Sequence, residues 1–360
     1  MELNVLVLPG DGIGPEVTCE AVRVLERIAA KFGHRLSIKE GLLGAEAIRR
    51  TGSPLPEETL RAALEADATL LGAVGLPEFD SAPPERRPER GLLGLRKALG
   101  VFANLRPVRA WRTLLDASPL KNERVEGTDL VIVRELTGGL YYGTPRGISG
   151  EGPDERGVNT MTYTRAEIER IAHVAFRLAR ARRRKLASVD KSNVLETSEL
   201  WRRVVSELAG RYPDVTLEHV LVDNCAMQLI LNPRRFDVVL TENMFGDILS
   251  DEAAVLAGSI GMLPSASIGE QRPSGAWVGL YEPVHGSAPD IAGQKRANPL
   301  GAVGSVAAML EYSFGLREEA AAVNRAIERV LENGVVTADL RPAGRAASTR
   351  EVGEALLAEI

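Results

Sequence analysis

The sequence is poor in cysteine, contains no long apolar run and has no excess of basic residues. Cys19 and Cys225 are its only two cysteines among 360 residues. Because disulfide-bonded secreted domains carry more, we expect two reduced thiols. No stretch reaches the roughly 18 uninterrupted apolar residues of a membrane-spanning helix. The N-terminus lacks the basic start and cleavage site of a signal peptide. We therefore expect a cytoplasmic protein without a membrane partner.

The formal net charge of −5 gives no electrostatic reason to expect a nucleic-acid partner. The one basic run, 180–185, ends a predicted helix, where cations complement exposed carbonyl groups. Nucleic-acid binding is the less favoured interpretation of that run. Hydrophobic residues make up 44% and charged residues 26% of the chain, as in ordinary globular enzymes. A chain of 360 residues favours two lobes.

Short apolar runs alternate with helical patterns along most of the chain. Strands are predicted at 3–8, 68–74, 129–136, 185–191, 215–223 and 236–242. One helix is predicted over 15–31. A second is predicted over 164–185, where Thr164 and Glu167 form a capping-box pattern. This alternation predicts an α/β fold with a largely parallel sheet.

The segment 243–251 holds the clearest candidate for a metal site. It follows the predicted strand 236–242 and should begin a helix, so Asp247 and Asp251 share one helical face. Their carboxylates suit a hard cation, although paired aspartates on a helix are also common without a metal. Asp223 is expected to end another strand, where side chains converge on the ligand crevice of open α/β sheets. Three such aspartates indicate Mg²⁺ or Mn²⁺.

Five further side chains are candidates for acid–base chemistry or for binding carboxylates. Lys191 is expected at the end of a strand, where a nearby cation would destabilise its ammonium and allow proton transfer; a surface lysine is the alternative. Tyr141 follows a glycine pair that permits a tight turn, although a tyrosine more often serves packing. Arginine forks match carboxylates, and the candidates are Arg96, Arg106 and Arg134. Taken singly, each is more often a surface residue.

Two glycine-rich loops are candidates for contacts with a cofactor. The loop 9–17 enters a helix and does not follow G-x-G-x-x-G, which argues against a standard Rossmann site. The loop 282–293 offers His285, small residues and Asp290. A carboxylate accepts hydrogen bonds from a ribose diol and repels a 2′-phosphate, so Asp290 favours NAD over NADP. The basic pair 295–296 leaves some NADP use open.

Eight segments, in order, resemble the β-decarboxylating dehydrogenases, the family of isocitrate and 3-isopropylmalate dehydrogenases. They are PGDGIGPEV (9–17), GLLGLRK (91–97), FANLRP (102–107), VRELTGGLYYG (133–143), SVDKSNVLE (188–196), TENMFGDILSDEA (241–253), GMLPSAS (261–267) and EPVHGSAPDIAG (282–293). The resemblance implies a two-lobe, doubly wound α/β fold that is not a standard Rossmann domain. It places the cofactor-binding loops in a lobe formed by 1–101 plus 258–360. The second lobe, 102–257, would hold the metal and catalytic residues and the dimer interface.

The resemblance also implies roles for individual residues. Proton transfer falls to Tyr141 and Lys191. The implied metal ligands are Asp223, Asp247 and Asp251. Substrate contacts are implied for Leu92, Arg96, Arg106, Arg134 and Asp223. Contacts with NAD are implied for Ile13, His285, Gly286, Ser287, Ala288, Asp290, Ile291 and Asn298.

Family members are usually homodimers with shared active sites. Lys191 and Asp223 match the positions that the partner subunit supplies. The Gly- and Pro-rich segment 144–157 is interpreted as an arm or hairpin that packs on that partner.

Substrate choice rests on Leu92, which matches the position that contacts the group distinguishing the family's substrates. Leucine offers an apolar wall to an isopropyl group, whereas isocitrate would place a carboxylate there at a high desolvation cost. The expected activity is therefore oxidative decarboxylation of 3-isopropylmalate with NAD. The alternatives are activity on tartrate, malate or homoisocitrate, and a non-catalytic regulatory role.

Two further features bear on stability. Gly301 and Gly304 stand in a predicted helix where family members usually carry larger helix formers, so we expect a weakened helix. Cys225, two residues after Asp223, is expected to serve packing.

Overall fold

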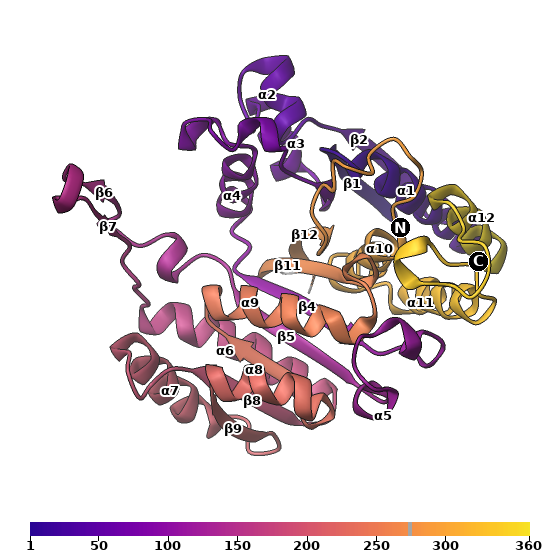
Figure 1. Ribbon diagram of the computed structural model, residues 1–360. Helices are drawn as coiled ribbons and strands as arrows, with labels where there is room; N and C mark the ends of the chain where they lie inside the picture. Colours follow the sequence, from indigo (N-terminus) through magenta and orange to yellow (C-terminus); the bar gives the residue numbers. More distant parts are fainter. Residues whose placement is uncertain (273–275) are drawn as a thin grey trace. The chain divides into compact units, whose positions relative to one another are not determined.

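The computed structural model describes residues 1–272 and 276–360. The chain forms two compact units. Unit 1 comprises Met1–Val101, Trp111–Pro119 and Ala257–Ile360, and unit 2 comprises Phe102–Ala110 and Leu120–Leu256. The segment Trp111–Pro119 thus belongs to unit 1, whereas the sequence placed it in the second lobe. Each unit is built of helices around a sheet (Figure 1), and the expected α/β class is confirmed.

The sheet of unit 1 has the strand order β2-β1-β3-β12-β11. Neighbours pair in parallel except β11, which is antiparallel to β12. The strands are β1 (Glu2–Gly10), β2 (Arg35–Glu40), β3 (Ala68–Ala73), β11 (Pro264–Gln271) and β12 (Trp277–Pro283). The helices are α1 (Gly14–Phe32), α2 (Ala45–Thr51), α3 (Glu57–Glu65), α4 (Pro88–Leu99), α10 (Leu300–Tyr312), α11 (Arg317–Glu332) and α12 (Thr349–Glu359).

The sheet of unit 2 has the strand order β4-β5-β10-β8-β9. Here β4 is antiparallel to β5 and the other pairs are parallel. The strands are β4 (Ala103–Arg109), β5 (Asp129–Glu135), β8 (Lys185–Asp190), β9 (Thr216–Leu221) and β10 (Val238–Thr241). The helices are α5 (Asn122–Val125), α6 (Arg165–Ala181), α7 (Glu196–Ala209), α8 (Val222–Leu231) and α9 (Asn243–Ala254).

The interior strands are apolar because both faces of each sheet are covered. All six residues of β3 are buried, and so are all four of β10. Such continuous apolar runs are typical of parallel strands with helices on both sides. The six predicted strands are all present, shifted by at most two residues at either end.

Of the two predicted helices, one matches closely and the other was predicted too long. The helix predicted over 15–31 is α1, Gly14–Phe32. The capping box of Thr164 and Glu167 is confirmed at the start of α6. The helix ends at Ala181 and not near residue 185, because Arg182 leaves the helical conformation with φ −111° and ψ −130°. The prediction that Asp223 ends a strand is wrong, because Asp223 lies in the first turn of α8. The positive end of the helix dipole stabilises an acidic side chain there.

The arginines of the run 180–185 hold neighbouring elements together. Arg180 donates to Asp214, and the Arg182 Nε donates to Asp237 at 2.9 Å. Arg183 donates to the carbonyl oxygen of Phe236 at 2.6 Å. These contacts give the run a structural role. The sequence predicted that its cations complement carbonyl groups at the helix end, whereas the carbonyl group of Phe236 belongs to the segment before β10.

The segment 144–157 contributes to a small hairpin of unit 2. β6 (Gly147–Ser149) and β7 (Arg156–Val158) pair in antiparallel fashion, and they stand apart from the helices of that unit (Figure 1). All six residues are exposed, including Ile148. The predicted hairpin is confirmed, while its contact with a partner stays a prediction.

Gly301 and Gly304 let α10 pack closely against the segment that leads into β11 and against its first residue, Pro264. A Cβ atom at Gly301 would lie 2.9 Å from the carbonyl oxygens of Gly261 and Leu263, and one at Gly304 would lie 3.1 Å from Pro264 Cβ. The expectation of a weakened helix considered helix propensity alone. In the fold, the missing side chains are what permits the packing. None of the helices among the described residues has the length and apolarity needed to cross a membrane.

Candidate functional site

Five of the predicted site residues come together around α9 in unit 2. Arg106 is on β4, Arg134 on β5, Tyr141 ends a short 3₁₀ helix, and Asp247 and Asp251 are on α9. Asp247 is the common point of contact. One of its oxygens accepts a hydrogen bond from Arg134 Nη1, and the other accepts one from the Tyr141 hydroxyl at 2.9 Å. The guanidinium of Arg106 approaches the same carboxylate at 3.6 Å.

Arg106 links the two aspartates of α9. Its Nη1 lies 3.2 Å from Asp251 Oδ1, and its Nε donates to Asn104 Oδ1 at 2.8 Å. The side chain of Asp251 is 61% exposed, whereas that of Arg106 is only 11% exposed. As the four-residue spacing predicts, one guanidinium reaches both carboxylates. Asp251 presents its oxygens to solvent.

Tyr141 is held as a neutral phenol. Partial burial raises the pKa of its hydroxyl, and the negative charge of Asp247 raises it further. The Arg134 guanidinium carbon lies 5.7 Å from the centre of its ring. The phenol therefore stays protonated near neutral pH, as a group that donates a proton must be.

Lys191 and Asp223 form a second group in unit 2. Lys191 directly follows β8, and its Nζ lies 2.8 Å from Asp223 Oδ2. This hydrogen bond lowers the pKa of the Asp223 carboxyl. Within the described part of the chain, no three His, Cys, Asp or Glu side chains are grouped so that they could hold a metal ion. The structure therefore does not bring Asp223 together with Asp247 and Asp251 in one chain.

Asp247 and Asp251 fit a divalent cation by the chemistry of their donors. Both supply carboxylate oxygens, the ligands that Mg²⁺ and Mn²⁺ prefer. Two carboxylates on one helix face make up part of a coordination shell. The remaining ligands must come from substrate, water or another chain.

In unit 1, the loop after β1 lies against the loop after β12. Ile13 donates its backbone N–H to the Ser287 carbonyl oxygen at 2.8 Å. Gly12 has a φ of +58°, and a Cβ there would lie 2.0 Å from that same oxygen. Only glycine permits this approach. Two loops predicted to bind the cofactor are thus held together.

His285 offers a buried hydrogen-bond acceptor in that region. Burial lowers its pKa, so the imidazole is neutral near pH 7. Its Nδ1 lies 2.9 Å from the Gly286 carbonyl oxygen and therefore carries the proton. The other nitrogen, Nε2, is buried without a hydrogen-bond partner among the described residues. An orphaned acceptor of this kind fits a ligand with an N–H or O–H donor.

The remaining predicted cofactor residues differ in exposure. Gly286 and Asp290 are exposed, whereas Ala288 and Ile291 are half-buried. Asn298 is buried, and its amide is engaged within unit 1: Nδ2 donates to Asp339 at 3.0 Å and Oδ1 accepts from the Leu300 N–H at 3.0 Å. Its side chain thus has a structural role of its own.

Leu92 and Arg96 lie on α4 in unit 1. Arg96 Nη2 is 2.5 Å from Glu282 Oε1, so this guanidinium is paired within its own unit. Leu92 is partly buried and packs against a core cluster that includes Leu95. Part of its apolar surface therefore stabilises the fold.

Two residues that hold neighbouring segments of unit 1 in place, Asp11 and Glu282, were not predicted from the sequence. Asp11 is 3% exposed. It accepts hydrogen bonds from the backbone N–H groups of Ala45 (2.9 Å), Glu46 (3.0 Å) and Gly75 (2.8 Å). Its position between two glycines after a strand was the available signal, because aspartate often binds nearby backbone N–H groups. Glu282, the partner of Arg96, lies in a quoted motif but had been given no role.

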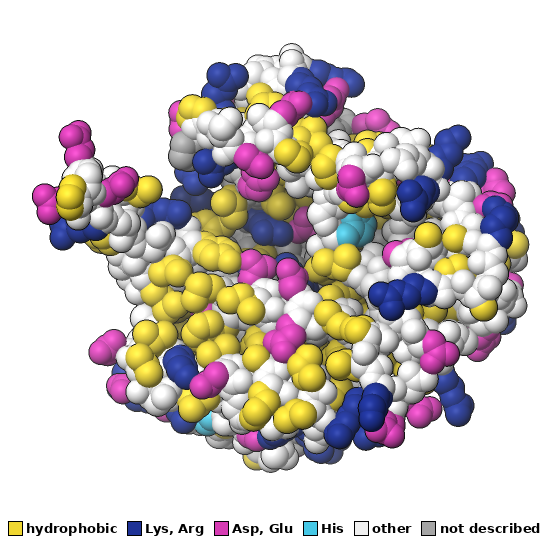
Figure 2. All heavy atoms as spheres, viewed as in Figure 1, with side chains coloured by type: hydrophobic (Ala, Val, Ile, Leu, Met, Phe, Trp, Pro, Cys, Tyr) yellow, Lys and Arg dark blue, Asp and Glu magenta, His cyan; other side chains and the backbone are white. Residues whose placement is uncertain are grey.

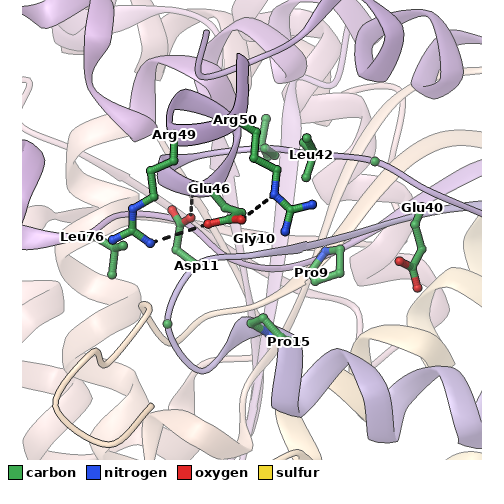
Figure 3. A pocket seen from close by; sticks show the side chains of 13 residues that line it. Pro9, Gly10, Asp11, Pro15, Glu40, Leu42, Glu46, Arg49, Arg50 and Leu76 are labelled. Carbon is green, nitrogen blue, oxygen red and sulfur yellow. Dashed lines mark hydrogen bonds and ion pairs between the residues drawn. The ribbon is translucent and has the colours of Figure 1, made fainter. Parts of the chain in front are cut away.

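A separate cavity of about 550 Å³ in unit 1 contains none of the predicted site residues (Figure 3). It is lined by the loop 9–12, the end of β2 and the exposed face of α2. Arg49 and Arg50 point toward Glu46 and form ion pairs with it. With Glu40 nearby, the charges of this cavity are mixed and select no ligand class.

The chain matches known proteins along almost its entire length. Residues 4–356 match the family described as isocitrate/isopropylmalate dehydrogenase. The chain is 58% identical to the 3-isopropylmalate dehydrogenase of Heyndrickxia coagulans, with 100% of this chain and 97% of that protein covered. It is 53% identical to the one from Aquifex aeolicus, covering 98% and 96%. The crystal structure of isocitrate dehydrogenase from Methylococcus capsulatus superposes with a TM-score of 0.87 at 34% identity, covering 99% of both chains.

Proposed function

The chain belongs to the isocitrate/isopropylmalate dehydrogenase family, and on that premise we propose that it oxidatively decarboxylates (2R,3S)-3-isopropylmalate. The products are 4-methyl-2-oxopentanoate, CO₂ and NADH, as leucine biosynthesis requires. The observation that carries the proposal is the cluster in which Arg106, Arg134 and Tyr141 meet the carboxylate of Asp247. It combines carboxylate binding, metal ligation and proton donation.

Arginine recognises the two carboxylates of the substrate. Arg106 and Arg134 are nearly buried, and a planar guanidinium in such surroundings binds a carboxylate through charge-assisted hydrogen bonds. Arg96 is assigned the same task in unit 1, where Glu282 orients its guanidinium. The apolar side chain of Leu92 selects the isopropyl group.

We assign NAD to His285, Asp290, Asn298 and the neighbouring loop residues, and Mg²⁺ or Mn²⁺ to Asp247, Asp251 and Asp223 of a second subunit. When bound, NAD would accept the hydride, and the cation would supply positive charge that stabilises negative charge on the substrate oxygens. The unpartnered His285 Nε2 supports a ligand at that loop. The exposed Asp290 carboxylate supports NAD over NADP.

Lys191 and Tyr141 move the protons. Lys191, acting through water, takes the proton of the 2-hydroxyl group as the C2 hydride leaves, and the substrate becomes a 3-carboxy-2-keto acid. Cleavage of the C3–carboxylate bond then releases CO₂ and leaves an enolate. Tyr141 gives its hydroxyl proton to C3 of that enolate, which produces the keto acid.

We propose a homodimer in which one subunit lends Lys191 and Asp223 to the other. Supporting this, Met227, Ile230 and Leu231 form an exposed apolar stripe on α8, and Ile248 on α9 is 59% exposed. Hydrophobic side chains gather over these two helices on the face shown in Figure 2. Large exposed apolar patches mark interaction surfaces. The exposed Ile148 of the β6–β7 hairpin is assigned to the same partner.

The two free cysteines support a reducing compartment, and we propose the cytoplasm. NADH formation measured over 3-isopropylmalate, isocitrate, homoisocitrate, malate and tartrate, with and without chelator, tests the activity. Equal kcat/KM for 3-isopropylmalate and isocitrate would contradict the substrate assignment. Sedimentation of wild type and Ile248→Glu tests the interface, since a monomeric wild type contradicts the dimer.

A further inference from the structure

Asn243 is the first residue of α9 and is only 1% exposed. Its side-chain amide lies between two groups that the proposed reaction uses. Oδ1 accepts hydrogen bonds from Arg134 Nη2 at 2.9 Å and Nε at 3.2 Å. Nδ2 donates to the carbonyl oxygen of Gly138 at 3.1 Å. One amide therefore joins a guanidinium on β5 to the turn that carries Tyr141.

The backbone of Asn243 is itself held in place. Its N–H donates to the Tyr163 hydroxyl at 3.0 Å, and that hydroxyl donates to Glu242 Oε2 at 3.2 Å. Glu242 caps α9 by accepting the Phe245 N–H at 2.5 Å. Tyr163, Glu242 and Asn243 are all buried. The amide is thus a fixed reference point within unit 2.

Both groups that the amide holds converge on Asp247. The Nε and Nη2 edge of Arg134 faces Asn243, and Nη1 of the same guanidinium contacts Asp247. Gly138 begins the turn through Gly139–Tyr141, and the Tyr141 hydroxyl contacts the other Asp247 oxygen. We infer that Asn243 is a positioning residue, resting on the proposed function: it orients Arg134 toward a substrate carboxylate and Tyr141 toward the carbon that takes up a proton.

Only an amide meets both demands at this position. Its oxygen accepts from the guanidinium while its nitrogen donates to the Gly138 carbonyl. Asn243→Asp keeps the size and the acceptor for Arg134. It also sets a carboxylate against the Gly138 carbonyl and neutralises Arg134. A neutralised Arg134 would bind the substrate carboxylate more weakly. Because a hydrogen bond to a charged group contributes about 1.5–3 kcal/mol, KM for 3-isopropylmalate should rise roughly ten- to a hundredfold.

The experiment compares wild type, Asn243→Asp and the matched control Asn122→Asp. Asn122 is also the first residue of a helix in unit 2, but it is exposed, and we expect its variant to keep wild-type kcat and KM. Asn243→Asp is then combined with Arg134→Lys. If Asn243 acts through Arg134, the Asn243→Asp change should raise KM less than about threefold in the Arg134→Lys background. If Asn243→Asp raises KM by the same factor in wild type and in Arg134→Lys, the inference is overturned.

Further measurements keep the inference separate from the proposed function. If wild type oxidises 3-isopropylmalate and Asn243→Asp does so with unchanged kcat and KM, the inference fails and the function stands. If wild type does not oxidise it, the function fails, and a crystal structure of Asn243→Asp decides the positioning. The inference would be overturned if that crystal structure showed Arg134 and Tyr141 in their wild-type positions relative to Asp247. Should Asn243→Asp not fold, Asn243→Ser, which shortens the side chain without adding charge, replaces it.

Discussion

Lys191 Nζ lies 2.8 Å from Asp223 Oδ2, so a proposed proton acceptor and a proposed metal ligand form an ion pair with each other. Asp223 is 65% exposed at its side chain. Exposed ion pairs add little to stability, typically about 0–1 kcal/mol. The pair therefore contributes little to folding and is available for the use that we propose for it.

Sharing of sites predicts complementation between inactive variants. Lys191→Ala and Asp247→Ala homodimers should each lose activity about a hundredfold or more, because each lacks a proton-transfer or metal-binding group in both sites. After subunit exchange, half of the dimers are mixed and each mixed dimer has one intact site. Activity should therefore recover to about a quarter of wild type.

The matched control mixes Asp247→Ala with Asp251→Ala. Both residues belong to the same subunit's share of a site, so no mixed dimer has an intact one. Recovery of activity in this control would contradict shared sites. So would a mixture of Lys191→Ala and Asp247→Ala that stays inactive after mass spectrometry has confirmed mixed dimers.

Leu92→Ala should lower kcat/KM for 3-isopropylmalate about tenfold or more, because an apolar wall for the isopropyl group is removed. The value for malate, which lacks that group, should change little. Leu99→Ala is the control, since Leu99 packs against the same core cluster from the same helix. Equal losses for both substrates would mean that Leu92 serves only the core.

Removal of the divalent cation should abolish NADH formation, and added Mg²⁺ should restore it. In Asp251→Asn, the Mg²⁺ concentration for half-maximal rate should rise roughly ten- to a hundredfold, since one charged ligand is lost. Glu252→Gln, the next position on α9, serves as control. Full activity in chelator would rule out the metal assignment.

Gly301→Ala should destabilise the fold by about 1–3 kcal/mol, because the new methyl group would meet two backbone oxygens at 2.9 Å. Gly94→Ala is the control within another helix, where a Cβ meets, among the described residues, only Leu55 Cδ2 at 3.5 Å. There the better helix propensity of alanine should stabilise by about 0.5–1 kcal/mol. Denaturant unfolding measures both, and a more stable Gly301→Ala would refute the packing argument.

The cap of α12 should make stability depend on acidic pH. Hydrogen bonds from Arg345 and from Ser348 lower the pKa of Glu351 to about 2. A carboxyl with a lowered native pKa stabilises the fold above its unfolded value of 4.5, and that contribution is lost as pH falls toward 2. Between these values, the melting temperature of Glu351→Gln should fall less steeply than that of wild type. If the melting temperatures of wild type and Glu351→Gln fell in parallel with pH, the role given to the Glu351 carboxylate would be contradicted.

Much of the fold was predictable because its signals are local. The capping box at Thr164, the apolar strand ending at Thr241 and the shared helix face of Asp247 and Asp251 all follow from neighbouring residues. Asp223 was misplaced because the apolar residues of β9 continue into Val222, and no breaker marks where the strand becomes a helix. The packing role of Gly301 was not predicted, because the carbonyl oxygens that it approaches, those of Gly261 and Leu263, lie 40 and 38 positions away in sequence.

Local patterns in the sequence specified the α/β class, six of the strands and the types of residue available for chemistry, since periodicity and capping act within a few residues. The fold brings Arg134 and Tyr141 onto the carboxylate of Asp247, although they lie 113 and 106 positions away from it in sequence. It also places Asn243 so that its amide joins the two. Contacts over such separations depend on how buried elements pack, and no local pattern encodes that packing.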